Sequence, residues 1–326
     1  MSDRGKKMSF KIFITKYIAQ AKALSPKYDT IYTVSKDEPI VFEDSEKVRL
    51  SFATIADTHL VDNEGSEKNL ANFFEDIGNS KEKFDAFLIA GDIAEYGKKK
   101  EYRRFFKVTD NQKVFPNVFL TMGNHDVRLQ YKRNQKIIMD KVNEYLKIDT
   151  KGKSFYSYDV NGYTFIAIGT EKRVLEKAYI TDEQIAFLDK ELARATKDGK
   201  PVFVMCHQAF AFTHGLPEVW KTGDMGEQSD LVRAVMEKHK NVFFITGHLH
   251  GGIFDGTYEV LNKENNVHSL SVPGYRKENN FGIKDCGVGY YCEVYDDKVV
   301  FKARNFQQGK NVVGDSDFLR IEIGII

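Results

Sequence analysis

The sequence predicts an α/β fold in one compact unit, because short apolar runs alternate with helix-like patterns along most of the chain. Its 326 residues are 42% hydrophobic and 29% charged, which is typical of a globular protein. No run approaches the roughly 20 apolar residues that span a bilayer, so a transmembrane protein is not predicted. The formal net charge of +1 supplies no strong basic field, and we expect no stable nucleic-acid partner.

The first segment, residues 1–47, is expected to form an amphipathic helix followed by extended chain. Residues 1–27 contain seven Lys or Arg residues and a single Asp. Apolar side chains recur at helical spacing from Phe10 to Ala21, and Pro26 ends the pattern. We favour a helix docked on the protein's own surface. Peripheral contact with an anionic membrane and a secretion signal are the alternatives.

Five apolar runs after residue 48 predict strands, which alternate with helices. The predicted strands are Leu50–Ala56, Phe87–Ala90, Val118–Met122, Val202–Cys206 and Val242–Thr246. The helix-like patterns lie near residues 66–78, 98–108, 130–147, 181–197 and 227–239. The fourth of these has a clear start, because Thr181 and Gln184 fit a capping box.

Two hairpins are predicted outside this alternation. Asn161-Gly162 marks a turn inside residues 154–170, and a second hairpin is expected within residues 290–306. No helical pattern follows residue 252, so the C-terminal quarter is predicted to consist of strands and loops.

The domain organisation follows from the absence of any obvious linker or repeat. We expect residues 48–252 to form the core and residues 253–326 to form a β-rich part of the same domain. Cysteines are too few for a disulfide scaffold, which favours a cytoplasmic protein; they are Cys206, Cys286 and Cys292.

Polar side chains of one kind follow each of the five predicted strands. The segments are Asp57-Thr58-His59, Gly91-Asp92, Gly123-Asn124-His125-Asp126, His207 and Gly247-His248-Leu249-His250. Ligands of open α/β sheets gather outside the carboxyl ends of the strands, so these groups predict one polar site. The three glycines would allow the sharp turns and a close approach of the backbone to an ion.

The side chains at these strand ends offer oxygen and imidazole donors and no thiolate. Seven donors are too many for one ion, but two ions that share a carboxylate can use them. The seven are Asp57, His59, Asp92, Asn124, His207, His248 and His250. Such a donor set accepts manganese, iron, zinc or cobalt, so two divalent transition-metal ions are the expected cofactors.

This series of motifs, which covers roughly residues 48–252, resembles the calcineurin-like metallophosphoesterases. The resemblance implies a four-layer sandwich of two mixed sheets flanked by helices, with a dinuclear centre at the edge of the sheets. It also implies two ligand sets that share Asp92 as the bridge. The first set is Asp57, His59, Asp92 and His250, and the second is Asp92, Asn124, His207 and His248.

The branch of the family is indicated by the residues after Asp92. Purple acid phosphatases resemble this pattern but carry a tyrosine three residues after the aspartate, where this sequence has Glu95. Protein phosphatases of the family carry Asp-Arg-Gly after the bridging aspartate, whereas this sequence has Glu95-Tyr96-Gly97. The layout is most similar to bacterial cyclic-nucleotide-type phosphodiesterases.

The resemblance therefore implies hydrolysis of a small phosphate ester, for which a nucleotide is a candidate. Diesters are favoured over monoesters, with in-line attack by a hydroxide that bridges the ions. A phosphomonoesterase or protein phosphatase of the same family, and a non-catalytic scaffold, are the alternatives.

His125 is the candidate general acid, because it shares a turn with the ligand Asn124 and need not itself bind metal. A neighbouring carboxylate should orient its ring and hold it protonated, and both Asp126 and Glu95 are candidates. His214 is interpreted as a satisfied or exposed loop residue. The polar segment Tyr275–Gly287 is a candidate lining of the substrate cleft, although a solvated loop is favoured.

Overall fold

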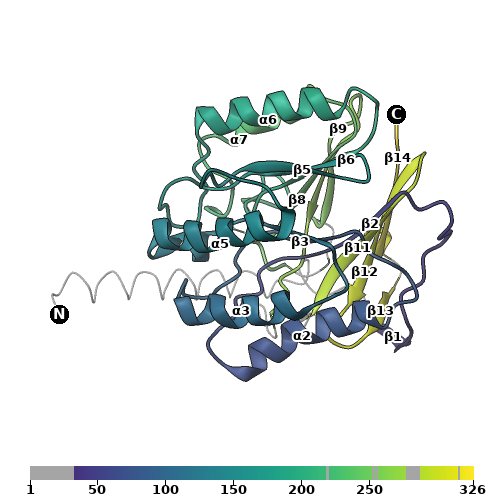
Figure 1. The fold of residues 1–326 in the computed structure, drawn as a ribbon. Helices are drawn as coiled ribbons and strands as arrows, with labels where there is room; N and C mark the ends of the chain where they lie inside the picture. Colours follow the sequence, from purple (N-terminus) through teal and green to yellow (C-terminus); the bar gives the residue numbers. More distant parts are fainter. Residues whose placement is uncertain (1–32, 218–219, 252, 254–255, 277–286, 315) are drawn as a thin grey trace.

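In the computed structural model, the described residues form two mixed β-sheets packed face to face, with helices on their outer sides (Figure 1). The structure describes residues 33–217, 220–251, 253, 256–276, 287–314 and 316–326. The predicted amphipathic helix of residues 10–21 and Cys286 lie outside these ranges. The α/β prediction and the sandwich implied by the resemblance are both confirmed.

The larger sheet has the order β1-β13-β12-β11-β2-β3-β4, and β14 pairs with β12. Its strands are β1 (Thr33–Asp37), β2 (Leu50–Ile55), β3 (Ala86–Ile89), β4 (Asn117–Leu120), β11 (Val288–Val294), β12 (Lys298–Asn305), β13 (Lys310–Val313) and β14 (Arg320–Gly324). Strands β2, β3 and β4 run parallel, whereas β11 runs antiparallel to β2. Strands β11, β12, β13 and β14 therefore extend the sheet that contains β2, β3 and β4.

The smaller sheet has the order β5-β6-β7-β8-β10-β9. Its strands are β5 (Tyr156–Val160), β6 (Tyr163–Ala167), β7 (Val202–Met205), β8 (Val242–Thr246), β9 (Tyr258–Asn262) and β10 (Val267–Ser271). Strands β6, β7, β8 and β10 are parallel, and β5 with β6 forms the hairpin predicted at Asn161-Gly162.

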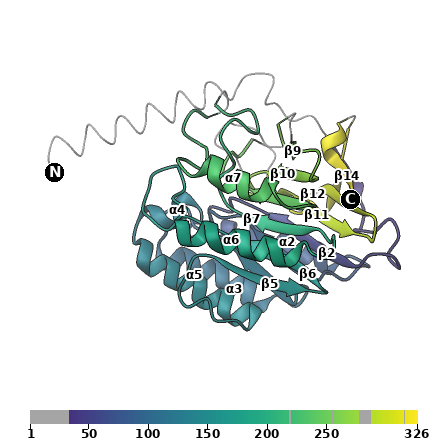
Figure 2. The ribbon, with the colours of Figure 1, turned by 90° about the horizontal axis from the view of Figure 1, so that it is seen from above.

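The helices cover the outer faces of the two sheets. They are α2 (Glu64–Gly78), α3 (Lys99–Asn111), α4 (Asn124–Arg128), α5 (Tyr131–Leu146), α6 (Asp182–Ala195) and α7 (Ser229–Glu237). Figures 1 and 2 show α6 and α7 over the smaller sheet, with α2 and α3 on the far side of the larger one. The five longer helices match the predicted positions, whereas the short helix α4 was not predicted. Each described helix is too short or too polar to cross a bilayer.

A layer of phenylalanine rings joins the two sheets. Phe52 of β2 lies 5.5 Å from Phe165 of β6 and 4.8 Å from Phe203 of β7, measured between ring centroids. Phe119 of β4 lies 4.7 Å from Phe165. Because such rings bury large apolar areas and interlock in edge-to-face or offset contacts, this layer fixes the position of one sheet against the other.

Alternation along β7 separates two apolar layers. Phe203 and Met205 belong to the core between the sheets, whereas Val202, Val204 and Cys206 pack under α6 and α7. Successive side chains of a strand point to opposite faces, as predicted for Cys206. The residue that follows, His207, is consequently directed away from the helices.

His214, in the loop after β7, is fully buried and hydrogen-bonded. Its Nδ1 lies 2.5 Å from the carbonyl oxygen of Gly256, and its Nε2 lies 2.7 Å from the hydroxyl of Ser269. It is thus a satisfied structural histidine. Burial lowers the pKa of His214 to about 4.

This low pKa predicts a loss of stability in acid. The unfolded chain, in which the pKa of histidine is about 6.5, binds the proton more tightly, so stability falls as the pH drops from 6.5 towards 4. Urea unfolding at pH 8 and pH 5 should show about 2 kcal/mol more loss for the natural chain than for His214→Gln. Equal losses in both proteins would contradict this assignment.

Candidate metal centre

The seven predicted donor side chains converge at one edge of the molecule. Those of Asp57, His59, Asp92 and Asn124 follow β2, β3 and β4 of the larger sheet, and those of His207, His248 and His250 follow β7 and β8 of the smaller one. The parallel strands of both sheets end at this edge. All seven residues are at most 3% exposed.

Four side chains form the first donor group: Asp57, His59, Asp92 and His250. His250 Nε2 lies 2.8 Å from Asp57 Oδ1 and 2.9 Å from His59 Nε2. His59 Nε2 lies 3.5 Å from Asp92 Oδ2.

The second donor group contains Asp92, His207 and His248, to which Asn124 adds its amide oxygen. His207 Nε2 lies 3.0 Å from Asn124 Oδ1, 3.1 Å from His248 Nδ1 and 3.3 Å from Asp92 Oδ2. The same oxygen of Asp92 thus faces both groups. The two groups contain the same residues as the two sets that the resemblance implied.

The donor atoms fit the surroundings of two cations. Ligand atoms about 2.1 Å from an ion and at right angles to each other lie about 3 Å apart, which is the spacing found here. The close approach of two ring nitrogens, His59 Nε2 and His250 Nε2, brings lone pairs together unless a proton or a cation lies between them. His59 Nδ1 lies 3.0 Å from Glu95 Oε2, and His207 Nδ1 is hydrogen-bonded to the carbonyl of Ala90 at 2.7 Å. Such partners leave each Nε2 free for an ion.

The backbone is strained at five of these residues. The φ angles are 54° at Asp57, 40° at His59, 51° at Asp92, 75° at His248 and 52° at His250. Each left-handed non-glycine residue costs of order 1–3 kcal/mol, and such residues cluster at functional sites. The turns that follow the strands therefore direct the donor side chains inward. The packing of the sheets offsets the conformational free energy that this costs.

At two turns there is no space for a side chain, so glycine is required. A Cβ at Gly123 would lie 2.1 Å from Asp92 Oδ1, and a Cβ at Gly91, whose φ is 83°, would lie 2.5 Å from His207 Nδ1. The backbone at these two glycines therefore lies directly against donor side chains.

The charges of the centre are mutually balanced. Burial would raise the pKa values of Asp57 and Asp92, but the neighbouring imidazoles outweigh it and hold both values below the usual range. Burial would lower the pKa values of His59 and His207, but the surrounding carboxylates raise each to about 9. In the metal-free chain, protons supply positive charge that cations would otherwise provide.

His125 lies beside both groups, as predicted, but neither candidate carboxylate orients it. Its Nδ1 lies 2.7 Å from the backbone carbonyl oxygen of Glu95, whereas the nearer carboxylate oxygen of Glu95 is 3.9 Å away. Burial lowers the pKa of His125 to about 4, against the attraction of Asp92, so the expectation of a ring held protonated by a carboxylate is wrong for the metal-free chain.

Asp126 has a different position from the one expected. Its carboxylate accepts hydrogen bonds from the backbone N–H groups of Gly123, Ile93 and Ala94 and from the hydroxyl of Tyr102. These four donors occupy both oxygens. Asp126 consequently fixes the loops after β3 and β4, and it does not hold the ring of His125.

Glu176 contacts the donor side chain of Asn124 and was not predicted from the sequence. Its Oε2 accepts a hydrogen bond of 2.8 Å from Asn124 Nδ2, and Arg128 pairs with it at 3.1 Å. This bond turns Asn124 Oδ1 towards His207. Glu176 stands 52 residues after Asn124 in a loop, and no local pattern marks it.

Trp220, the single tryptophan of the chain, was also missed. Its ring stacks on His248, with centroids 4.5 Å apart.

Comparison with known proteins agrees with this geometry. A family model described as calcineurin-like phosphoesterase matches residues 50–252. No curated protein matches the chain.

Two solved structures share the fold. A dimetal phosphatase from Danio rerio has a TM-score of 0.61 and 15% identity, covering 86% of this chain and all of that one. GAP50, the anchor in the inner membrane complex of Plasmodium, has a TM-score of 0.56 and 14% identity, covering 85% and 89%. At these identities the likeness establishes the fold alone. Because the family match spans more than half of the chain and includes all seven donors, the chain belongs to the calcineurin-like phosphoesterase family, hydrolases of phosphate esters, and uses two divalent metal ions.

Proposed function

We propose that this protein is a phosphodiesterase that acts on a small phosphodiester, with His125 donating a proton to the leaving alcohol. One observation carries the proposal: the two donor groups meet at Asp92 Oδ2, and His125 Nε2 lies 3.9 Å from that same oxygen. Positioning of phosphorus and protonation of its leaving group are thereby combined in one place.

The ions, when bound, neutralise the phosphate oxygens and activate a water for in-line attack. The carboxylates that would bind the ions are held in place because one oxygen of each accepts a hydrogen bond from the backbone. The backbone N–H of His248 donates to Asp57 Oδ2, and the backbone N–H of His125 donates to Asp92 Oδ1, both at 2.8 Å. These bonds keep one oxygen of each carboxylate in place and leave the other for an ion.

As the proposed acid, His125 would donate its proton from Nε2. A carbonyl oxygen can only accept, so Nδ1 carries the hydrogen that it donates to Glu95. Nε2 is the ring atom directed to the centre. The negative charge of a bound phosphate ester would favour protonation there.

Diesters are favoured over monoesters by the charge around the centre. A diester carries one negative charge at neutral pH, whereas a monoester carries up to two. The two nearby arginines already pair with carboxylates, Arg128 with Glu176 and Arg276 with Glu95. This partial neutralisation suits the smaller substrate charge.

The identity of the metal and the cellular compartment are also part of the proposal. Mixed imidazole, carboxylate and amide donors suit manganese, iron, zinc or cobalt. The free buried thiols of Cys206 and Cys292 are compatible with a cytoplasmic protein. We propose a small phosphoester as the partner and no nucleic acid.

The preferred ester can be measured directly. With Mn²⁺ present, we expect bis-p-nitrophenyl phosphate and cyclic nucleotides to be hydrolysed faster than p-nitrophenyl phosphate. His125→Ala should lower turnover of cyclic nucleotides by about 10²–10⁴-fold, because their alkoxide leaving group needs a proton. The nitrophenyl esters should lose far less, and metal content should be unchanged.

The control for this experiment is His239→Ala, which removes a histidine distant from the centre. Faster monoester hydrolysis would indicate a phosphomonoesterase instead. An absence of turnover of every ester would indicate a scaffold, and equal turnover of cyclic nucleotides by His125→Ala would remove the acid role.

Glu176 provides a test of the second donor group. Glu176→Ala frees the amide of Asn124, so affinity for the second ion should fall by about 10–100-fold. Isothermal titration calorimetry of the metal-free protein with Mn²⁺ measures this loss of affinity. Glu183→Ala, which removes an exposed partner of Lys153, is the matched control. Unaltered affinity for both ions would show that Glu176 does not position Asn124.

A further inference from the structure

We infer that the cavity between α2 and the segment after β10 binds the alcohol that leaves the phosphate, and that this alcohol is a polyhydroxy compound of about nucleoside size. This inference rests on the proposed function. The cavity has a volume of about 310 Å³. That volume is at the lower end of the range for small-molecule sites and has room for a ring-bearing alcohol.

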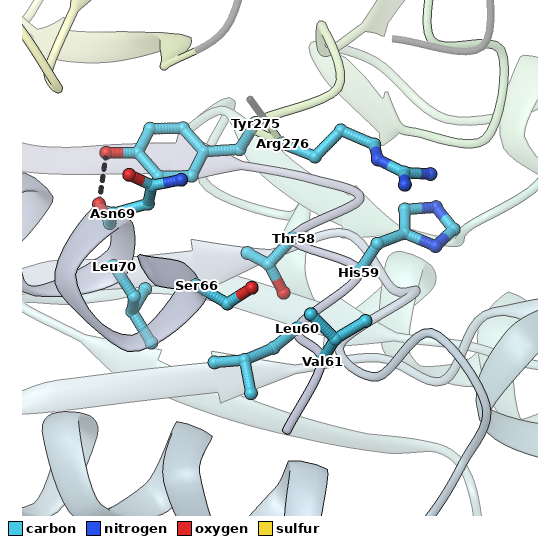
Figure 3. Close-up of a pocket in the computed structure, with 9 residues that line it drawn as sticks. All are labelled: Thr58, His59, Leu60, Val61, Ser66, Asn69, Leu70, Tyr275 and Arg276. Carbon is cyan, nitrogen blue, oxygen red and sulfur yellow. Dashed lines mark hydrogen bonds between the residues drawn. The ribbon is translucent and has the colours of Figure 1, made fainter. Parts of the chain in front are cut away.

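The cavity lies beside the metal centre. His59, a member of the first donor group, is also part of the cavity wall. Figure 3 shows the ring of His59 and the guanidinium of Arg276 at one end, while Ser66, Asn69 and Leu70 of α2 line the other. A group that extends from phosphorus past His59 and Arg276 would enter this cavity.

The end formed by His59 and Arg276 lies next to the proposed proton donor. Arg276 Nη1 is 3.3 Å from Glu95 Oε2, and the carbonyl of the same residue accepts from His125. The rings of His59 and His125 meet edge to face, with centroids 4.5 Å apart. The oxygen protonated by His125 would belong to the leaving alcohol, and the cavity is the neighbouring space in which we place that alcohol.

The lining specifies the chemistry of that alcohol. Ser66 and Asn69, both half-buried, offer a hydroxyl and an amide, and Arg276 adds N–H donors. Leu60 and Val61 supply apolar surface. None of the described residues that line the cavity carries a carboxylate. Neutral hydrogen-bonding groups beside an apolar wall suit a ring that carries several hydroxyl groups.

Two other residues hold the wall together. Thr58 Oγ1 donates to the carbonyl of Ile93, and Tyr275 Oη donates to the carbonyl of Asn69 at 3.1 Å. The latter bond uses only the backbone of Asn69, as Figure 3 shows. The side chain of Asn69 can therefore be replaced without breaking it.

The experiment measures binding and turnover separately. Adenosine serves as the probe alcohol, and calorimetry with Mn²⁺-loaded protein gives its affinity. Asn69→Leu should weaken adenosine binding at least tenfold, whereas Lys68→Ala should leave both the adenosine affinity and kcat/KM for bis-p-nitrophenyl phosphate within twofold of the natural protein. Lys68→Ala, an exposed neighbour on α2, is the matched control, and the melting temperature and metal content of each variant verify its folding.

The two possible failures are distinguishable. If the natural protein hydrolyses bis-p-nitrophenyl phosphate but does not bind adenosine, or if Asn69→Leu binds it as tightly as Lys68→Ala does, the cavity assignment is wrong. If adenosine binds and Asn69→Leu weakens it while no ester is hydrolysed, the proposed function fails and the alcohol site stands.

Discussion

One oxygen of Asp92 faces two sets of donors at once. Oδ2 lies 3.5 Å from His59 Nε2 and 3.3 Å from His207 Nε2, while Oδ1 is held by the N–H of His125. A fully buried carboxylate is stable only when positive charge compensates it. The surrounding imidazoles, the turns that direct them inward and the ions they are suited to hold all meet this requirement.

The fold supplies the rigidity that this arrangement needs. Donors come from both sheets, so a shift of one sheet against the other would separate the two groups. The phenylalanine layer around Phe52, Phe165 and Phe203 prevents such a shift. The left-handed turns at Asp57, Asp92 and His248 are the local cost of directing side chains from the strand ends into one space.

The sequence was sufficient to predict the α/β alternation and the convergence of the seven donors, because each donor directly follows an apolar strand. It was insufficient where distant loops contribute. Glu176 reaches Asn124 from 52 residues away, and the carbonyl that orients His125 has no residue-type signal. Asp126 was chosen for its adjacency to His125, but its side chain accepts the N–H of Gly123 in its own turn. The short helix α4 arises from this local contact.

The central claim is that Asp92 joins two ions, and a crystal structure of the Mn²⁺-loaded protein with anomalous scattering data tests it most directly. The account predicts two manganese peaks, both in contact with Asp92 Oδ2. One should lie among Asp57, His59 and His250, and the other among Asn124, His207 and His248. A single peak, or two peaks that do not share Asp92, would contradict it.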